Sequence, residues 1–162
     1  MQRRRHLVVL IGIPGSGKTT YARQLLARCR AMRLVSPDII RERLYPGYEQ
    51  GEAEHRQIND RRIFAIAYRE MADGLEAGQD VVFDATSLTR IHRRKLLRLA
   101  EGFGALAVAH YFRTSLPLAL GRIARRQRRV PAGAIAHMLK ILEPPEREEG
   151  FARVVVHVQK RS

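Results

Sequence analysis

The segment from Gly12 to Thr19 contains the residue types that bind phosphate in many nucleotide-binding proteins. It reads Gly-Ile-Pro-Gly-Ser-Gly-Lys-Thr and matches the pattern G-x-x-x-x-G-K-[ST] at every fixed position. Glycines let the backbone curl until consecutive N–H groups point at phosphate oxygens, and the following helix presents its positive end to the same anion. In such loops the lysine, here Lys18, reaches the β- and γ-phosphates. The residues expected to contact a nucleotide are Gly12, Gly15, Ser16, Gly17, Lys18, Thr19 and Thr20.

Two residues are candidate ligands of a magnesium ion. The hydroxyl of Thr19 is the first, because the last residue of this loop pattern binds the metal. The second is Asp84, which directly follows the apolar run Val81-Val82-Phe83. A carboxylate after a buried strand has the rough form of the second metal-binding motif of these loops, although an aspartate that caps the next turn is nearly as common. The sequence therefore predicts ATP and Mg²⁺ as cofactors.

A second group of chemically capable residues lies in Ser36-Pro37-Asp38-Ile39-Ile40-Arg41. Asp38 follows a predicted strand, at the end where open α/β sheets bind their ligands. Asp38 and Arg41 are three residues apart and share one face of a helical turn. There the carboxylate can accept the proton of an incoming hydroxyl, and the guanidinium can bind a phosphate through two hydrogen bonds. The alternative is an ordinary ion pair in a capped helix.

Arginines dominate the segment before Val130-Pro131. Four of them recur at helical spacing and predict one basic face that closes over ATP as a lid and neutralises transition-state charge, or else a solvated face. The arginines of this run are Arg122, Arg125, Arg126, Arg128 and Arg129. A second basic cluster, Arg90-Ile91-His92-Arg93-Arg94-Lys95, predicts either contacts with the phosphates of a polynucleotide or a solvated helix start.

The overall charge favours a polyanionic partner. Thirty Lys and Arg residues against sixteen Asp and Glu leave a formal net charge of +14, which raises the local concentration of polyanions such as nucleic acid. An arginine-rich codon usage is the alternative. The 162 residues fit one domain, 1–162. The single cysteine, Cys29, is typical of a cytoplasmic protein, and no apolar run is long enough to span a membrane.

Short apolar runs alternate with amphipathic stretches, which predicts a three-layer α/β fold with a five-stranded parallel sheet and a helical lid around 122–132. The expected strands are Leu7–Ile11, Met32–Val35, Asp80–Asp84, Ala107–Phe112 and Val154–Val158. The expected helices are Lys18–Arg30, Pro37–Tyr45, His55–Ala77, Thr89–Ala100, Leu116–Gln127 and Pro131–Leu142. Ser36 is the expected N-cap of the second helix, with Pro37 at its first position.

With these blocks in order, the chain resembles the kinase domain of the polynucleotide 5′-hydroxyl kinases of phage and bacterial end-healing enzymes. The resemblance covers nearly the whole chain and rests on G-x-P-G-S-G-K-T, S-P-D-x-x-R, V-F-D-A-T-S-L and the arginine-rich segment before V-P. It implies that the strand before the phosphate loop is central in the sheet. It also implies that Asp38 is the general base on a 5′-hydroxyl and that Arg41 contacts a phosphate of the acceptor. Arg122 and Arg126 match the lid arginines that contact ATP, and the catalytic set is then Lys18, Asp38, Arg41 and Arg126.

Three functions are compatible with these residues. The first is an ATP-dependent polynucleotide 5′-hydroxyl kinase, with DNA or RNA 5′ ends as partner. The second is a kinase of a small hydroxylated acceptor such as a sugar, an antibiotic or a nucleotide-like molecule. The third is a nucleic-acid-binding ATPase, for which Asp38 is dispensable. No N-K-x-D motif for guanine is present, and the chain length argues against motor and AAA-type ATPases.

Overall fold

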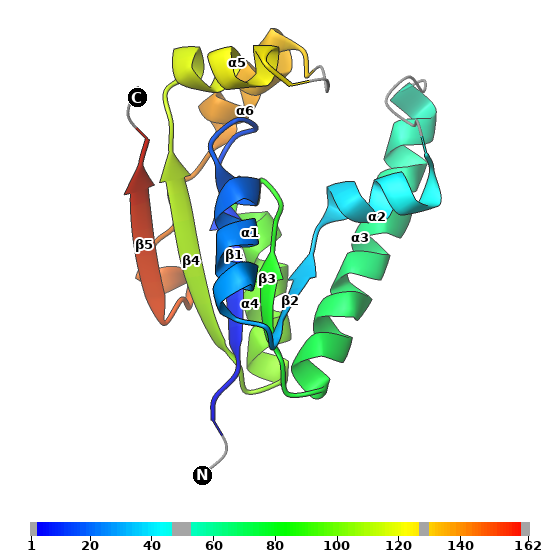
Figure 1. Ribbon diagram of the computed structural model, residues 1–162, viewed down its shortest axis with the longest axis vertical. Coiled ribbons are helices and arrows are strands. Elements are labelled where there is room, and N and C mark those ends of the chain that lie inside the picture. The colour runs from blue at the N-terminus through cyan, green and yellow to red at the C-terminus, as the bar shows by residue number, and fades with distance from the viewer. Residues whose placement is uncertain (1–2, 47–52, 127–129, 160–162) are drawn as a thin grey trace.

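The computed structural model describes residues 3–46, 53–126 and 130–159, without the side chains of 53–59. Within these residues five strands form one parallel sheet in the order β2-β3-β1-β4-β5 (Figure 1). Their bounds are β1 His6–Ile11, β2 Met32–Val35, β3 Asp80–Phe83, β4 Leu106–Arg113 and β5 Arg153–Val158. The α/β class, the parallel sheet and the central position of the strand before the phosphate loop are confirmed.

Helices cover both faces of the sheet. The central strand β1 is an unbroken apolar run because side chains of both faces are buried, as expected inside a parallel sheet. Leu7 and Val9 pack against α3 (Ala53–Glu76) and α4 (Arg90–Gly102) on one face. Val8 and Leu10 pack on the other face, where α1 (Lys18–Arg28) contributes a buried alanine. The sheet is thus the middle of three layers.

The helix α2 (Pro37–Leu44) begins as its sequence predicts. Ser36 is extended, and its hydroxyl oxygen accepts a hydrogen bond from the N–H of Ile39 at 3.5 Å. Pro37 occupies the first turn, where its missing N–H has no cost. Because β2 ends one residue earlier, this cap places Asp38 at the carboxyl edge of the sheet.

Two further helices, α5 (Leu116–Ala124) and α6 (Ala132–Ile141), lie over the carboxyl ends of the strands (Figure 1). They share a separate apolar cluster with the phosphate loop and with the loop after β3. Ile13 and Leu88 are buried there against Ala119, Ile123 and Ile135. The helices above the site are therefore packed directly onto the segments that form it.

The expected helix over 116–127 was too long. It ends at Ala124, and the N–H of Arg126 donates to the carbonyl of Ile123 at 2.9 Å, a tightened bond that closes the last turn. The prediction that four arginines form one helical face is therefore wrong, because Arg125 and Arg126 follow the helix. Arg128 and Arg129 lie outside the described residues.

The other predicted boundaries differ from the observed ones by a few residues at most, which is the usual uncertainty of helix and strand ends. A short 3-10 helix, η2 (Arg147–Glu149), was not predicted. Among the described helices, none combines the length and the apolar character needed to cross a bilayer.

Candidate active site

Two glycines of the phosphate loop lie too close to neighbouring atoms to carry a side chain. Gly15 has a φ of +79°, and a Cβ there would lie 2.6 Å from the carbonyl oxygen of Ala119. At Gly12 a Cβ would lie 2.8 Å from the hydroxyl oxygen of Ser16. Only glycine combines this backbone conformation with so close an approach. Gly12, a fixed position of the pattern, and Gly15, a variable one, thus allow a tight loop.

Lys18 is held inside this loop. Its side chain is buried, and Nζ donates to the carbonyls of Gly12 at 2.9 Å and Ile13 at 2.8 Å and to the hydroxyl of Ser16 at 3.3 Å. Burial lowers the pKa of Lys18 to about 8, although the charge of Asp84 opposes the shift. The ammonium is therefore positioned before any anion enters, at the cost of a reduced preference for its charged form.

This lowered pKa gives a pH-dependent prediction for nucleotide binding. Above pH 8 the empty site increasingly contains neutral Lys18, whereas nucleotide phosphates favour the charged form. Binding then requires proton uptake, so we expect the dissociation constant of ATP to rise by up to about tenfold per pH unit above that point. Calorimetry at several pH values measures it. In Lys18→Met this rise should be absent, and an ATP affinity that stays constant in the parent through alkaline pH would contradict the prediction.

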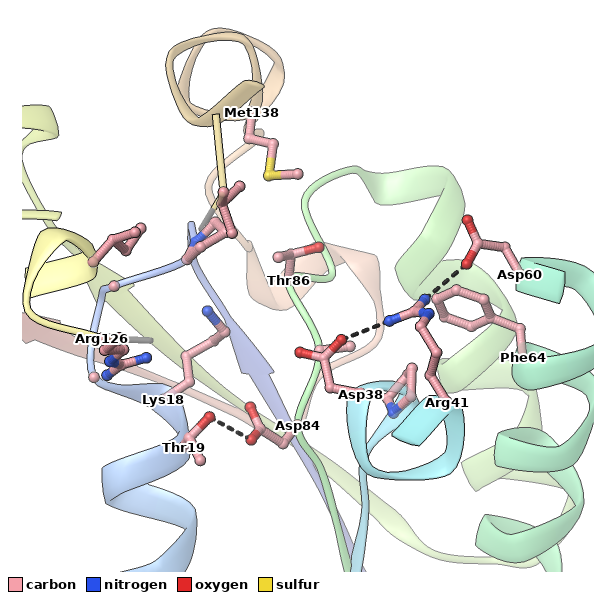
Figure 2. A pocket seen from close by; sticks show the side chains of 17 residues that line it. Lys18, Thr19, Asp38, Arg41, Asp60, Phe64, Asp84, Thr86, Arg126 and Met138 are labelled. Carbon is pink, nitrogen blue, oxygen red and sulfur yellow. Dashed lines mark hydrogen bonds and ion pairs between the residues drawn. The ribbon is translucent and has the colours of Figure 1, made fainter. Parts of the chain in front are cut away.

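Thr19 and Asp84 are adjacent although they lie far apart in the sequence. The hydroxyl of Thr19 donates to Oδ2 of Asp84 at 2.8 Å (Figure 2). Burial raises the pKa of Asp84, while the hydrogen bond from Thr19 and the charge of Lys18 act against this shift. Magnesium in phosphate-transfer sites is usually bound by one or two protein oxygens together with phosphates and water. The pair fits such an ion, even though no group of three metal-binding side chains occurs among the described residues.

A cavity of about 400 Å³ extends from the phosphate loop to α2 and α3. Lys18 and Asp84 lie on one side of it and Asp38 on the other, so the two predicted groups of residues share one space (Figure 2). Asp38 is well exposed, whereas most of Arg41 is covered. The arrangement allows a hydroxyl beside Asp38 to face a phosphate held by the loop.

Helix α3 contributes two residues to this cavity that were not predicted as part of the site. Asp60 and Phe64 lie one turn apart on α3 and line its far wall (Figure 2). Arg41 donates through one terminal nitrogen to Asp38 and through the other to Asp60, both at 2.7 Å. The guanidinium thus bridges two carboxylates and does not present both terminal nitrogens to the cavity. The only signal in the sequence was that Asp60 and Phe64 share a helix face.

A second cavity, of about 610 Å³, lies on the other side of α1. Here Arg122 donates to the carbonyl of Gly15 at 3.3 Å and to the side-chain oxygen of Gln159 at 3.1 Å. Arg122 lines only this cavity, whereas Arg126 lines both. The other described residues that line this second cavity are Gly17, Thr20, Tyr21, Gln24, Phe112, Arg125 and His157. The two predicted lid arginines therefore occupy different positions relative to the loop.

Aromatic rings form one wall of this second cavity. His157 stacks on Phe112 with ring centroids 4.5 Å apart, and its Nε2 is 2.8 Å from Nδ1 of His110. Burial lowers the pKa of His110 to about 4 and also lowers the pKa of His157. At neutral pH the pair is therefore uncharged.

The predicted basic cluster at 90–95 is not a continuous surface patch. Arg93 is fully buried and forms a bidentate ion pair with Glu149, with distances of 2.8 and 2.7 Å. Both sequence interpretations, a phosphate contact and a solvated residue, are wrong for Arg93. It shares the buried face of α4 with Leu96 and Ala100.

Comparison with solved structures shows where this fold occurs. A chain of an RNA repair complex of Pnkp1, Rnl and Hen1 superposes with a TM-score of 0.74 and 20% identity, over 88% of this chain and 45% of that one. A sugar kinase from a Janibacter species superposes with a TM-score of 0.69 and 22% identity, over 96% of this chain and 86% of that one. A gluconokinase from Sinorhizobium meliloti superposes with a TM-score of 0.64 and 20% identity, over 99% of this chain and 86% of that one. At these identities the matches show the fold.

One curated relative is similar in sequence. It is the 6-phosphofructo-2-kinase/fructose-2,6-bisphosphatase of Arabidopsis thaliana, 33% identical over 112 residues. The match covers 60% of this chain, but the chain spans only 15% of the length of the plant enzyme.

The parallel sheet and the phosphate loop define a P-loop protein with the fold of the small kinases. Within that class the chain belongs to AAA_33, a family described as an AAA domain, whose model matches residues 7–145. Chain length had argued against AAA-type ATPases. It does not exclude this family, which is described as an AAA domain. The solved structures with this fold include a gluconokinase and a chain of an RNA repair complex, so the comparisons do not determine an acceptor.

Proposed function

We propose that the protein is an ATP-dependent polynucleotide 5′-hydroxyl kinase. The observation that carries the kinase part is the shared cavity, because Lys18 and Asp38 both line a space that can hold a γ-phosphate and a hydroxyl (Figure 2). The net charge of +14 supports a polyanionic acceptor, because a small acceptor needs only a local pocket. The resemblance to polynucleotide kinases, carried by Asp38 and Arg41, supports the same acceptor.

In this proposal each side chain has a defined task. Lys18 leaves its carbonyl partners and binds the β- and γ-phosphates, where negative charge accumulates in the transition state. Thr19 and Asp84 would hold Mg²⁺, which would supply positive charge to the phosphates. Asp38 orients the acceptor hydroxyl and takes its proton as the oxygen attacks phosphorus. The new O–P bond forms as the bond to the β-phosphate oxygen breaks, and ADP leaves with that electron pair.

The second cavity is the proposed site of the nucleoside part of ATP. It begins at Gly17, so a nucleotide whose phosphates occupy the loop can extend directly into it. Arg122 and the ring of His157 can contact the base, and Gln159 has an amide that can read its edge. Arg126 lines both cavities and is placed to contact the phosphates between them.

A specific observation favours a small acceptor as the second candidate. Arg41 is already engaged by two carboxylates, Asp38 and Asp60, so an acceptor phosphate must compete with one of them. A neutral polyol needs no such competition and can instead hydrogen-bond the carboxylates. The sugar kinases with the same fold are consistent with this alternative.

Asp60→Asn distinguishes the two acceptors. With a neutral amide at this position, Arg41 loses one anionic partner and is freed for a phosphate. For a polynucleotide acceptor we expect the Michaelis constant to fall by roughly twofold to fivefold, the scale of a partly exposed ion pair. For a neutral polyol it should rise, because a hydrogen-bond acceptor is weakened. Steady-state kinetics with both acceptor types measure the change.

The control for this variant is Asp73→Asn, an exposed aspartate on the same helix that is not part of the cavity wall. It removes the same charge from α3 at a distance from the site. An equal fall in the Michaelis constant in both variants would mean that bulk charge, and not the release of Arg41, is responsible.

The salt dependence of acceptor binding tests the polynucleotide assignment. Each phosphate neutralised by the protein releases counterions. The logarithm of the affinity for a single-stranded 5′-hydroxyl oligonucleotide should therefore fall steeply and linearly with the logarithm of the salt concentration. Fluorescence anisotropy of a 3′-labelled oligonucleotide across a salt series gives the slope. A slope near zero, or no binding at low salt, would favour the small acceptor.

A further inference from the structure

The loop that follows β3 connects the separate parts of the active site. It carries Asp84 at its start, and the N–H of Asp84 donates to the carbonyl of Val35 at 2.9 Å. Two residues later, the carbonyl of Thr86 accepts the N–H of Gly12 at 3.0 Å. The side chain of Leu88 is buried in the apolar cluster below α5 and α6. This segment, 84–88, therefore contacts the metal-binding pair, the phosphate loop and the lid.

The same loop has an unfavourable local conformation. Ser87 is the one non-glycine residue with a positive φ among the described residues, at 48°. Its hydroxyl oxygen is buried, and within the described part of the chain it has no hydrogen-bond partner. Side chains with a Cβ adopt this region at an energetic cost, and they keep it only where surrounding contacts enforce it. The contacts that enforce it must therefore be identified.

Arg93 provides the contacts that hold Ser87 in this conformation. One terminal nitrogen of its guanidinium donates to the carbonyls of Ser87 at 3.0 Å and Leu88 at 3.1 Å. Its other two nitrogens are bound by Glu149, whose side chain is only 7% exposed. Glu149 is fixed in turn, because its Oε1 accepts the N–H of Glu146 at 3.1 Å. The guanidinium thus has few other orientations available and holds both carbonyls of the strained turn.

We propose that Arg93, oriented by Glu149, is a positioning residue of the phosphotransfer site. It fixes the 84–88 segment, so that Asp84 meets Thr19 and the carbonyl of Thr86 holds the phosphate loop through Gly12. Arg93 touches neither nucleotide nor acceptor and acts only through this segment. The metal part of the inference rests on the proposed magnesium site, whereas the link to Gly12 does not.

A different result is expected if the ion pair of Arg93 and Glu149 only stabilises the fold. A buried ion pair can often be replaced by uncharged residues of similar size without loss of stability, whereas removal of one partner leaves an uncompensated charge. The informative variant is therefore the double substitution Arg93→Met with Glu149→Gln, which removes both charges and retains the acceptor for Glu146. If the pair only stabilises the fold, this variant regains the properties of the parent.

Two measurements on the ligand-free and ligand-bound protein decide the question. The first is amide exchange of Gly12 by NMR, compared with amides of β4. The second is the factor by which Mg²⁺ tightens binding of a non-hydrolysable ATP analogue. In the double variant we expect Gly12 to exchange at least about tenfold faster while β4 is unchanged. The magnesium enhancement should fall by about tenfold, as for other residues that orient a metal ligand.

Arg93→Lys and Arg94→Met complete the series. Arg93→Lys keeps the charge but not the fork of donors, so it should give intermediate values, and it decides the question if the double variant does not fold. Arg94→Met changes the neighbouring exposed arginine and should resemble the parent. Parent values of both Gly12 exchange and magnesium enhancement in a folded variant of Arg93 would overturn the proposal. Exchange that accelerates equally in β4 would overturn it too, since that indicates global destabilisation.

Discussion

Asp38→Asn is expected to lower the rate of γ-phosphate transfer by about 10²–10⁴-fold, the usual contribution of a general base. The amide keeps the size of the side chain and one oxygen that can accept from Arg41, but it cannot take the proton of the acceptor hydroxyl. Binding of ATP should change little, because Asp38 lies on the acceptor side of the cavity (Figure 2). Single-turnover transfer, measured with enzyme in excess, separates this chemical step from product release.

Asp60→Asn is the matched comparison for this variant. It also removes one carboxylate partner of Arg41, at the same distance of 2.7 Å, but no proton transfer is assigned to it. Its transfer rate should therefore fall by less than about tenfold. If both variants lose activity to the same extent, the effect comes from the position of Arg41, and the assignment of Asp38 as the base is wrong.

Lys18→Ala is expected to lower turnover by roughly a hundredfold or more, the scale observed for the loss of one electrostatic stabiliser of a transition state. The ammonium lies inside the loop that is expected to hold the β- and γ-phosphates. The fold should persist, because a buried charge is removed and not created, although three loop acceptors lose their donor. Thermal unfolding and steady-state turnover of the same preparation measure the two effects.

A folded Lys18→Ala protein with near-parent turnover would contradict the phosphate-loop assignment. Arg98→Ala is the control for charge alone, because Arg98 is an exposed cation on α4 outside both cavities. It should leave turnover within about twofold of the parent, since exposed charges away from the site contribute little.

Local patterns predicted the parts of the site that lie within one short segment. The phosphate loop is defined by spacing between Gly12 and Thr19, and the start of α2 by Ser36 and Pro37, so both could be read from the chain. The parallel sheet followed from the alternation of apolar runs with amphipathic stretches. These features depend on backbone conformation and periodicity, which neighbouring residues determine.

The missing parts depend on contacts between distant segments. Asp60 and Phe64 join the cavity only because α3 packs beside α2, and no local pattern specifies that approach. The arginine spacing at 122–129 predicted a longer helix than the one that ends at Ala124. Arg93 was mistaken for a surface residue because it stands in a basic run. Its spacing from Leu96 and Ala100 placed it on the buried face of α4, and this was the signal that was overlooked.

The most direct test of the proposed function is transfer of label from γ-labelled ATP to a 5′-hydroxyl oligonucleotide. The same oligonucleotide with a 5′-phosphate is the control acceptor, and Asp38→Asn is the control enzyme. The account predicts that the parent labels only the 5′-hydroxyl oligonucleotide, in a reaction that requires Mg²⁺, and that Asp38→Asn labels it at least about a hundredfold more slowly. An oligonucleotide that stays unlabelled, under conditions in which the parent phosphorylates a neutral polyol, would contradict the polynucleotide assignment.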